Sequence, residues 1–169
     1  MSKQDTLHDR NLVQNDFIAD LETLRERAEQ HMERGAVTGG YQAERPTVLR
    51  LLNEALATEL VCMLRYKRHE RMAEGPQAEV IAKEFAEHAR QEAQHADQLA
   101  ERIVQLGGEP DYDPKGLRER AHSEYRVGHD LESMVRENLV AERMAVETYT
   151  EMIRFIGDGD PTTRRVLED

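Results

Sequence analysis

Three glutamates occupy positions where a helix would normally carry an apolar residue facing its core. Glu59, Glu92 and Glu142 each interrupt a series of apolar residues spaced three and four apart. An ionised carboxylate in a helical core is costly unless a metal ion or another partner compensates its charge. Because these glutamates fall on three successive long helical stretches, the sequence predicts that they surround a metal site.

The second of these glutamates is followed by a histidine three residues later, as Glu92 and His95. Side chains at this spacing share one face of a helix, about 5–6 Å apart at Cβ. A carboxylate and an imidazole together form a ligand set that suits iron, manganese or zinc. Helical bundles that hold two irons combine two lone glutamates with two Glu-x-x-His pairs. This chain offers Glu59 and Glu142 as lone glutamates and Glu92 with His95 as one pair.

Two weaker interpretations concern the same spacing. Glu119 and His122 are also three apart, but they lie in a Gly- and Pro-rich stretch without an apolar series. We therefore expect that pair to be solvated. For Glu92 and His95 the alternative is a buried ion pair that binds no metal. The glutamates on the neighbouring helices favour the metal site over this alternative.

Helical spacing of apolar residues defines the elements that would position these side chains. Long helices are predicted over 47–74, over 77–106, and from the N-cap Asp130 to just before Gly157. A tight turn makes the first two antiparallel. About 23 residues separate the second and third, enough at about 3.3 Å per residue to cross the length of a bundle. The predicted fold is all-α, a ferritin-like four-helix bundle with a long crossover between helices two and three.

The two ends of the chain add shorter elements. A polar arm over 1–10 and a short amphipathic helix over about 12–34 precede the bundle, so we expect a division into 1–46 and 47–169. Asp160 and Pro161 read as the N-cap and first position of a fourth helix, which is truncated in this chain. A second Glu-x-x-His at the level of Glu142 would be expected near position 175. Glu168 lies about two turns short of that level.

Composition narrows the class of function. The 169 residues suffice for one domain with a substantial core, and a net charge of −11 favours cations over nucleic acid as partners. The single Cys62 excludes an internal disulfide and a cysteine-based metal site. The sequence has no apolar run of about 18 residues and no hydrophobic signal core at its N-terminus. We therefore expect a soluble, cytoplasmic protein without a membrane partner.

Three segments carry a resemblance to a known family. Residues 51–69, which include Glu59, Tyr66 and His69, resemble the first helix of bacterioferritins. Residues 92–110 resemble the second helix and its exit, and residues 138–142 fit the third. The 33-residue separation of Glu59 and Glu92 agrees with the same pattern. The resemblance covers about 47–169.

The resemblance implies a ferroxidase that stores iron. Glu59, Glu92, His95 and Glu142 would be ligands of a di-iron centre, Glu92 would bridge the irons, and Tyr66 would be the redox-active tyrosine. The family's haem-ligating Met follows the glutamate of helix two, where this chain has Ala93, so haem is not expected. Fe(II) would be oxidised by oxygen or peroxide and kept as Fe(III) inside a homo-oligomeric cage. The N-terminal extension also fits the mini-ferritin relatives, which form smaller cages.

Two other functions fit the residues. A manganese catalase or a peroxidase could use the same scaffold and ligands, although the single cysteine excludes a rubredoxin-type iron domain. A helical module that assembles without any metal is the third possibility. Metal analysis of the purified protein, together with a catalase assay, separates these functions.

Overall fold

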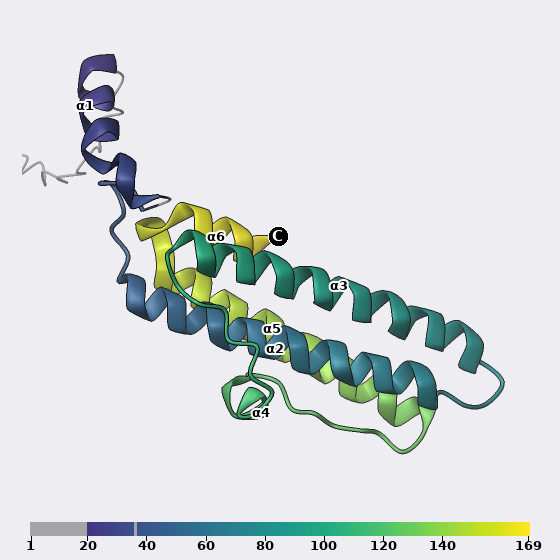
Figure 1. The fold of residues 1–169 in the computed structure, drawn as a ribbon. Helices are drawn as coiled ribbons and strands as arrows, with labels where there is room; N and C mark the ends of the chain where they lie inside the picture. The colour runs from purple at the N-terminus through teal and green to yellow at the C-terminus, as the bar shows by residue number, and fades with distance from the viewer. Residues whose placement is uncertain (1–19, 36) are drawn as a thin grey trace, which may run out of the picture.

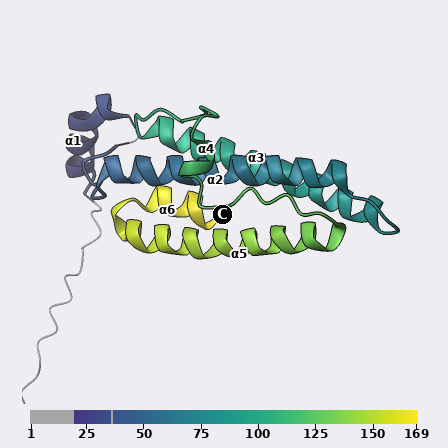
Figure 2. The same ribbon diagram turned by 90° about the horizontal axis from the view of Figure 1, so that it is seen from below.

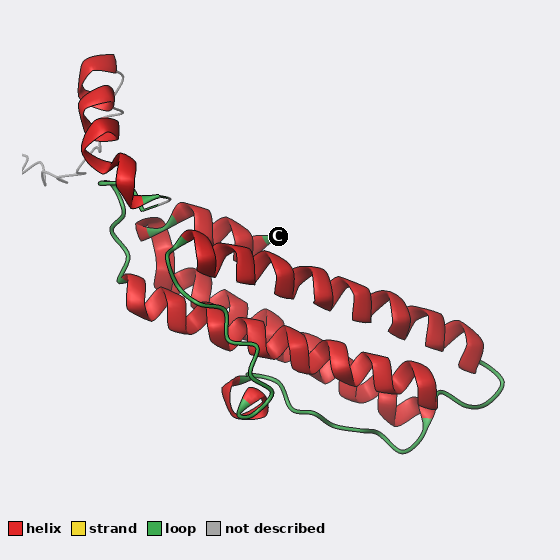
Figure 3. Ribbon diagram, viewed as in Figure 1, coloured by secondary structure: helices red, strands yellow, loops and turns green. Residues whose placement is uncertain are grey.

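The helices begin and end close to the residues that the sequence predicts. A computed structural model describes residues 20–35 and 37–169, and this part of the chain contains no strand. The all-α fold class is therefore confirmed (Figures 1 and 3). The elements are α1 (Leu21–His31), a 3-10 turn (Met32–Arg34), α2 (Arg45–Met72), α3 (Ala78–Gln105), α4 (Leu117–Arg120), α5 (Leu131–Ile156), a second 3-10 turn (Gly157–Gly159) and α6 (Pro161–Glu168).

α5 and α6 start at the aspartates Asp130 and Asp160, which act as N-caps. The Asp130 carboxylate accepts a hydrogen bond from the Ser133 N–H at 2.7 Å, and the Ser133 hydroxyl oxygen accepts one from the Asp130 N–H at 3.1 Å. The Asp160 carboxylate accepts a hydrogen bond from the Thr163 N–H at 2.9 Å. Each cap contributes about 1 kcal/mol. The predicted starts of α5 and α6 are confirmed.

α2 and α3 form an antiparallel hairpin that packs along most of its length (Figure 1). The turn between them uses Gly75 at φ 109°, a conformation that side chains other than glycine rarely adopt. Two of the three apolar clusters of the described residues lie between the long helices, and the third packs α4 on α2. Of the two between the long helices, one contains Leu52, Leu56, Leu99, Ile103, Met152, Ile156 and Leu167, and the other Tyr66, Phe85, Ala89 and Met134. Glu59 and Glu92 lie between these two clusters along their helices.

The crossover fixes the direction of the remaining helices. It leaves the end of α3, passes α2 and reaches the opposite end of the bundle, where α5 begins (Figure 1). α5 therefore runs antiparallel to α2 and parallel to α3. The short α6 turns back alongside the C-terminal part of α5 (Figure 2). This is the ferritin-like topology with one long crossover.

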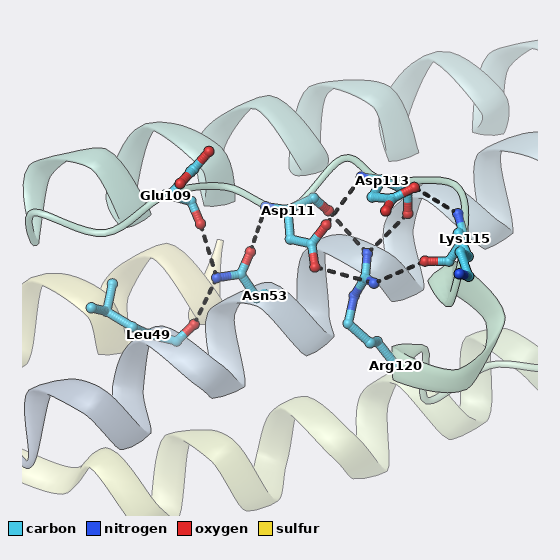
Figure 4. Close-up of polar contacts among 7 residues, drawn as sticks. All are labelled: Leu49, Asn53, Glu109, Asp111, Asp113, Lys115 and Arg120. Atoms are coloured by element: carbon cyan, nitrogen blue, oxygen red, sulfur yellow. Dashed lines mark hydrogen bonds and ion pairs between the residues drawn. The ribbon is translucent and has the colours of Figure 1, made fainter.

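Asn53 of α2 attaches the first part of the crossover to the bundle (Figure 4). Its amide nitrogen donates to the carbonyl oxygens of Leu49 at 3.1 Å and Glu109 at 3.3 Å, and its amide oxygen accepts from the Asp111 N–H at 2.8 Å. Arg120 pairs with the Asp111 carboxylate at 3.1 Å. One polar side chain on α2 therefore sets where the chain leaves α3.

The crossover differs from its prediction in two ways. It contains the one-turn helix α4, which the Gly- and Pro-rich sequence does not indicate. Glu119 is exposed as expected, but His122 is half-buried, with its Nε2 3.2 Å from the Glu54 carboxylate. The expectation that His122 is solvated was wrong because the crossover folds back onto α2, a contact between segments that are distant in the sequence.

A buried guanidinium attaches the second part of the crossover. Arg65 is fully buried; its Nε donates to the Asn138 side-chain oxygen at 2.9 Å, and its Nη1 donates to the Ser123 hydroxyl at 3.0 Å and the Glu124 carbonyl at 2.8 Å. These hydrogen-bond partners are all neutral groups. Asn138 belongs to α5, so this network ties α2, the crossover and α5 together.

His69 extends this network and is expected to make the stability of the protein depend on pH. It is fully buried, its Nε2 donates to the Val127 carbonyl at 2.9 Å, and its Nδ1 accepts from the Asn138 amide at 2.9 Å, so the ring is held neutral. Burial lowers the pKa of His69 below its usual value. The unfolded chain therefore takes up a proton first as the pH falls through about 6.5, which destabilises the folded state.

Urea denaturation between pH 7 and pH 5.5 measures this effect. Because Glu92 and His95 titrate in both proteins, the effect of His69 is the difference between them: the free energy of unfolding of the wild type minus that of His69→Gln should become smaller as the pH falls. Equal slopes for the two proteins would show that His69 does not contribute.

A buried ion pair holds α6 on α3. The Arg102 Nη2 donates to both carboxylate oxygens of Asp160, at 2.9 and 3.1 Å, and its Nε donates to the Thr163 hydroxyl at 2.8 Å. Arg102, Asp160 and Thr163 are at most 4% exposed. The cap of α6 and its attachment to the bundle therefore depend on the same carboxylate.

The helix predicted over about 12–34 is described only from Asp20, the N-cap of α1, onward, and the predicted arm over 1–10 lies outside the described residues. Within α1 no residue is buried, its apolar residues Leu21 and Leu24 are 81% and 43% exposed, and Met32, directly after the helix, is 80% exposed. The apolar spacing thus predicts a helix correctly over the described part, but the bundle does not cover its apolar face. None of the described helices contains a stretch apolar and long enough to cross a bilayer.

Candidate metal centre

Three of the four predicted ligands meet between α2 and α3. Glu59 comes from α2, and Glu92 and His95 from α3, and one ligand atom from each lies within 4.8 Å of the others. The His95 Nδ1 is 3.5 Å from the Glu59 Oε2 and 3.4 Å from the Glu92 Oε2. The glutamates are 4% and 7% exposed, whereas the His95 side chain is 47% exposed. The cluster thus has a buried acidic side and a half-exposed imidazole.

The pKa values of the cluster reflect this crowding. Burial, together with the neighbouring Glu59, raises the pKa of Glu92 to about 8. Hydrogen bonds to Glu59 and Glu92 raise the pKa of His95 to about 10. Burial acts to raise the pKa of Glu59 as well, but hydrogen bonds from His95, Glu92 and Tyr149 lower it overall. These shifts keep a proton on Glu92 near neutral pH, beside an ionised Glu59 and a protonated His95.

The donor atoms of this cluster fit a divalent transition metal. Two carboxylates and one imidazole are the oxygen and nitrogen ligands that iron, manganese and zinc accept. A cation would supply the positive charge that the two buried glutamates require. The residues present thus fit one half of a carboxylate-bridged metal centre.

Glu142, the fourth predicted ligand, lies near the cluster without joining it. It is half-buried on α5, and its Oε1 accepts a hydrogen bond from the Tyr66 hydroxyl at 2.5 Å. Burial and the neighbouring Glu142 both raise the pKa of Tyr66. Tyr66 itself is 2% exposed and stacks on His88, with ring centroids 5.0 Å apart and planes at 13°. The structure therefore places Tyr66 against Glu142 rather than against the three-residue cluster.

A cavity of about 390 Å³ joins these groups. Glu59, Glu92, His95 and Glu142 all line it, so the four predicted ligands face one space. The wall is completed by residues of α2, α3, α5 and the end of α6: Cys62, His88, Gln91, Gln98, Leu99, Ala141, Ala145, Val146, Tyr149, Val166, Leu167, Glu168 and Asp169. Glu168 is exposed and pairs with Arg164 at 3.3 Å. The four predicted ligands thus line one cavity, although only Glu59, Glu92 and His95 come together in it.

Tyr149 also belongs to the site, although its spacing on α5 indicates only a residue of the apolar face of that helix. Its hydroxyl donates a hydrogen bond to the Glu59 Oε1, across the bundle from α5 to α2. A signal was present in the sequence: Tyr149 follows Glu142 by seven residues, just as Tyr66 follows Glu59. The repeated spacing marks both tyrosines as neighbours of the site.

Comparison with known proteins agrees with this fold and site. Residues 49–169 match the family described as ferritin-like domain. The chain belongs to this ferritin-like family. Within it, the bacterioferritin of Mycobacterium avium is 36% identical over 126 residues, which is 72% of this chain and 72% of that protein. The resemblance to bacterioferritins that the sequence indicates is therefore confirmed.

Solved structures lead to the same family. A dodecameric thioferritin, the bacterioferritin-related protein from Bacteroides fragilis, is 31% identical, covers 75% of this chain and 77% of its own, and superimposes with a TM-score of 0.72. A mycobacterial bacterioferritin is 30% identical over 75% of this chain and 74% of its own, with a TM-score of 0.64. Dps from Thermosynechococcus elongatus, at 22% identity and a TM-score of 0.70 over 73% and 80% of the two chains, shares the fold.

Proposed function

We propose that this protein binds Fe(II) at the candidate metal centre, oxidises it with oxygen or peroxide, and stores the Fe(III) product. The observation that carries the proposal is the meeting of Glu59, Glu92 and His95 on one cavity with Glu142. Membership of the ferritin-like family and the likeness to bacterioferritins support it.

The four ligands would differ in which iron they bind. Glu59, Glu92 and His95 would hold the first iron, and Glu92 would share its carboxylate with a second iron on the side of Glu142. Bound iron would supply the redox chemistry. His95 is the most exposed of the three clustered ligands, so its imidazole would meet an incoming ion first. Tyr66, hydrogen-bonded to Glu142, would be the side chain placed to give up an electron.

Storage requires an enclosed space, so we propose that the chain forms a homo-oligomeric cage. The bacterioferritin-related protein from Bacteroides fragilis, which covers three quarters of this chain, is a dodecamer. The net charge of −11 would favour the attraction of cations to such an assembly.

The test is aerobic oxidation of Fe(II) by the wild type and by Glu92→Ala, followed as ferric absorbance. We expect the initial rate to fall at least about 100-fold in the variant, because changes in groups that merely support metal ligands already cost 10–100-fold. Glu87→Ala, at an exposed position of α3 where the glutamate pairs with Arg90, is the matched control and should keep the wild-type rate. Equal rates for the wild type and Glu92→Ala would refute the proposal.

A further inference from the structure

Two hydrogen bonds cross between α2 and α5 on either side of the candidate metal centre. Tyr149 of α5 donates to Glu59 of α2, and Tyr66 of α2 donates to Glu142 of α5. The helices are antiparallel (Figures 1 and 2). Because each tyrosine lies seven residues after the glutamate on its own helix, the antiparallel register places each tyrosine opposite the glutamate of the other helix. The two contacts are related by an approximate local two-fold axis.

The two oxygens of the Glu59 carboxylate have different partners because Tyr149 binds one of them. The Glu59 Oε1 accepts the Tyr149 hydroxyl, and the Oε2 faces the His95 Nδ1 at 3.5 Å. A carboxylate held at one oxygen by a hydrogen bond cannot rotate freely, so its other oxygen stays directed at the cluster. Groups that fix a metal ligand in this way change metal affinity without touching the metal.

The second contact acts on a different ligand. Tyr66 holds Glu142, which lines the cavity but lies outside the three-residue cluster. The ring of Tyr66 is fixed by its stacking on His88 and by Phe85, whose ring centroid is 6.0 Å away. Loss of the Tyr66 hydroxyl would therefore free Glu142 and leave Glu59, Glu92 and His95 in place.

We propose that Tyr149 is a positioning residue for the Glu59, Glu92 and His95 half of the metal centre, and that Tyr66 serves the Glu142 half. This inference rests on the proposed function, since it assumes that the cluster binds a divalent metal. The metal affinity of each half therefore depends on a different tyrosine. Tyr149 affects the affinity of the half formed by Glu59, Glu92 and His95, and Tyr66 does not.

Anaerobic titration with Co(II), followed by its visible absorbance, separates the halves in the full chain. We expect Tyr149→Phe to weaken the tighter Co(II) site by about 10- to 100-fold, because its hydroxyl supports a ligand of that site. Tyr66→Phe should leave the same site within about twofold of the wild type. Tyr112→Phe, a half-exposed tyrosine of the crossover, is the control for removing a hydroxyl elsewhere. Circular dichroism and the melting temperature of the metal-free variants report folding.

The outcomes distinguish this inference from the function on which it rests. Unchanged Co(II) affinity in Tyr149→Phe overturns it, even if the metal-free protein melts at a lower temperature, because that result describes a structural role only. Equal weakening of the tighter site by Tyr66→Phe overturns the separation of the halves. A wild type that binds no Co(II) refutes the metal centre itself and with it both proposals.

Discussion

Replacing Asp160 by Ala is expected to lower the free energy of unfolding by about 3–5 kcal/mol. The substitution leaves the Arg102 guanidinium buried without its carboxylate, since Arg102 is only 4% exposed. It also removes the N-cap of α6, because the same carboxylate accepts the Thr163 N–H. The hydrophobic contact of Leu167 with the main core depends on α6 keeping its place, so the loss extends beyond the polar groups.

Urea denaturation of the full chain measures this loss, and two further variants define its source. Asp158→Ala removes a carboxylate that is 97% exposed and pairs with Arg164 on the surface, so its cost should stay below about 1 kcal/mol. Asp160→Asn keeps a capping oxygen but not the charge, and its stability should fall between those of Asp160→Ala and the wild type. If Asp160→Ala costs no more than Asp158→Ala, the buried pair does not hold α6.

The second large effect is expected for Arg65→Ala, which should also cost about 3–5 kcal/mol. Removing the guanidinium leaves Asn138, Ser123 and the Glu124 carbonyl without their donor, and each unsatisfied buried group costs about 1–3 kcal/mol. The missing side chain also leaves a cavity in the core. Relief from burying a charge among neutral partners offsets part of this cost.

This variant should loosen the crossover in particular. Hydrogen exchange of residues 121–128 should become faster relative to α2, because the guanidinium attaches that segment to the bundle. Arg90→Ala removes an exposed arginine of α3 that pairs with Glu87, and it serves as the control. Equal stability of the two variants, or unchanged exchange in the crossover, would contradict the anchoring role of Arg65.

Local spacing was sufficient to predict the long helices and the main ligand cluster. Glu59, Glu92 and His95 could be found because a charged residue within an apolar series stands out on any single helix. α2 and α3 are joined by a short turn, so their shared face follows directly from their sequences. The structure places His95 beside Glu59 and Glu92, and its side chain is half-exposed at the cavity; its role as a ligand stays a prediction.

Contacts that depend on the register between α2 and α5 could not be predicted in the same way. Tyr149 meets Glu59, and Arg65 meets Asn138, only because the crossover sets how far α5 slides along α2. The seven-residue spacing of glutamate and tyrosine that α2 and α5 share is compatible with this register, but no pattern within either helix alone encodes it. Arg65 also looks like an ordinary surface residue in the sequence, since arginine is rarely buried without a carboxylate. The placement of Glu142 against Tyr66 depends on the same register between α2 and α5.

The position of the three clustered ligands on a single hairpin has a consequence for the order of folding. α2 and α3 are joined by a tight turn, so Glu59 can meet Glu92 and His95 after closure of a short loop. α5 can bring Glu142 only after closure of the crossover of about 25 residues, which costs more chain entropy and is slower. The acidic cluster can therefore form while α5 is still undocked, with protonated His95 as its cationic partner within the hairpin.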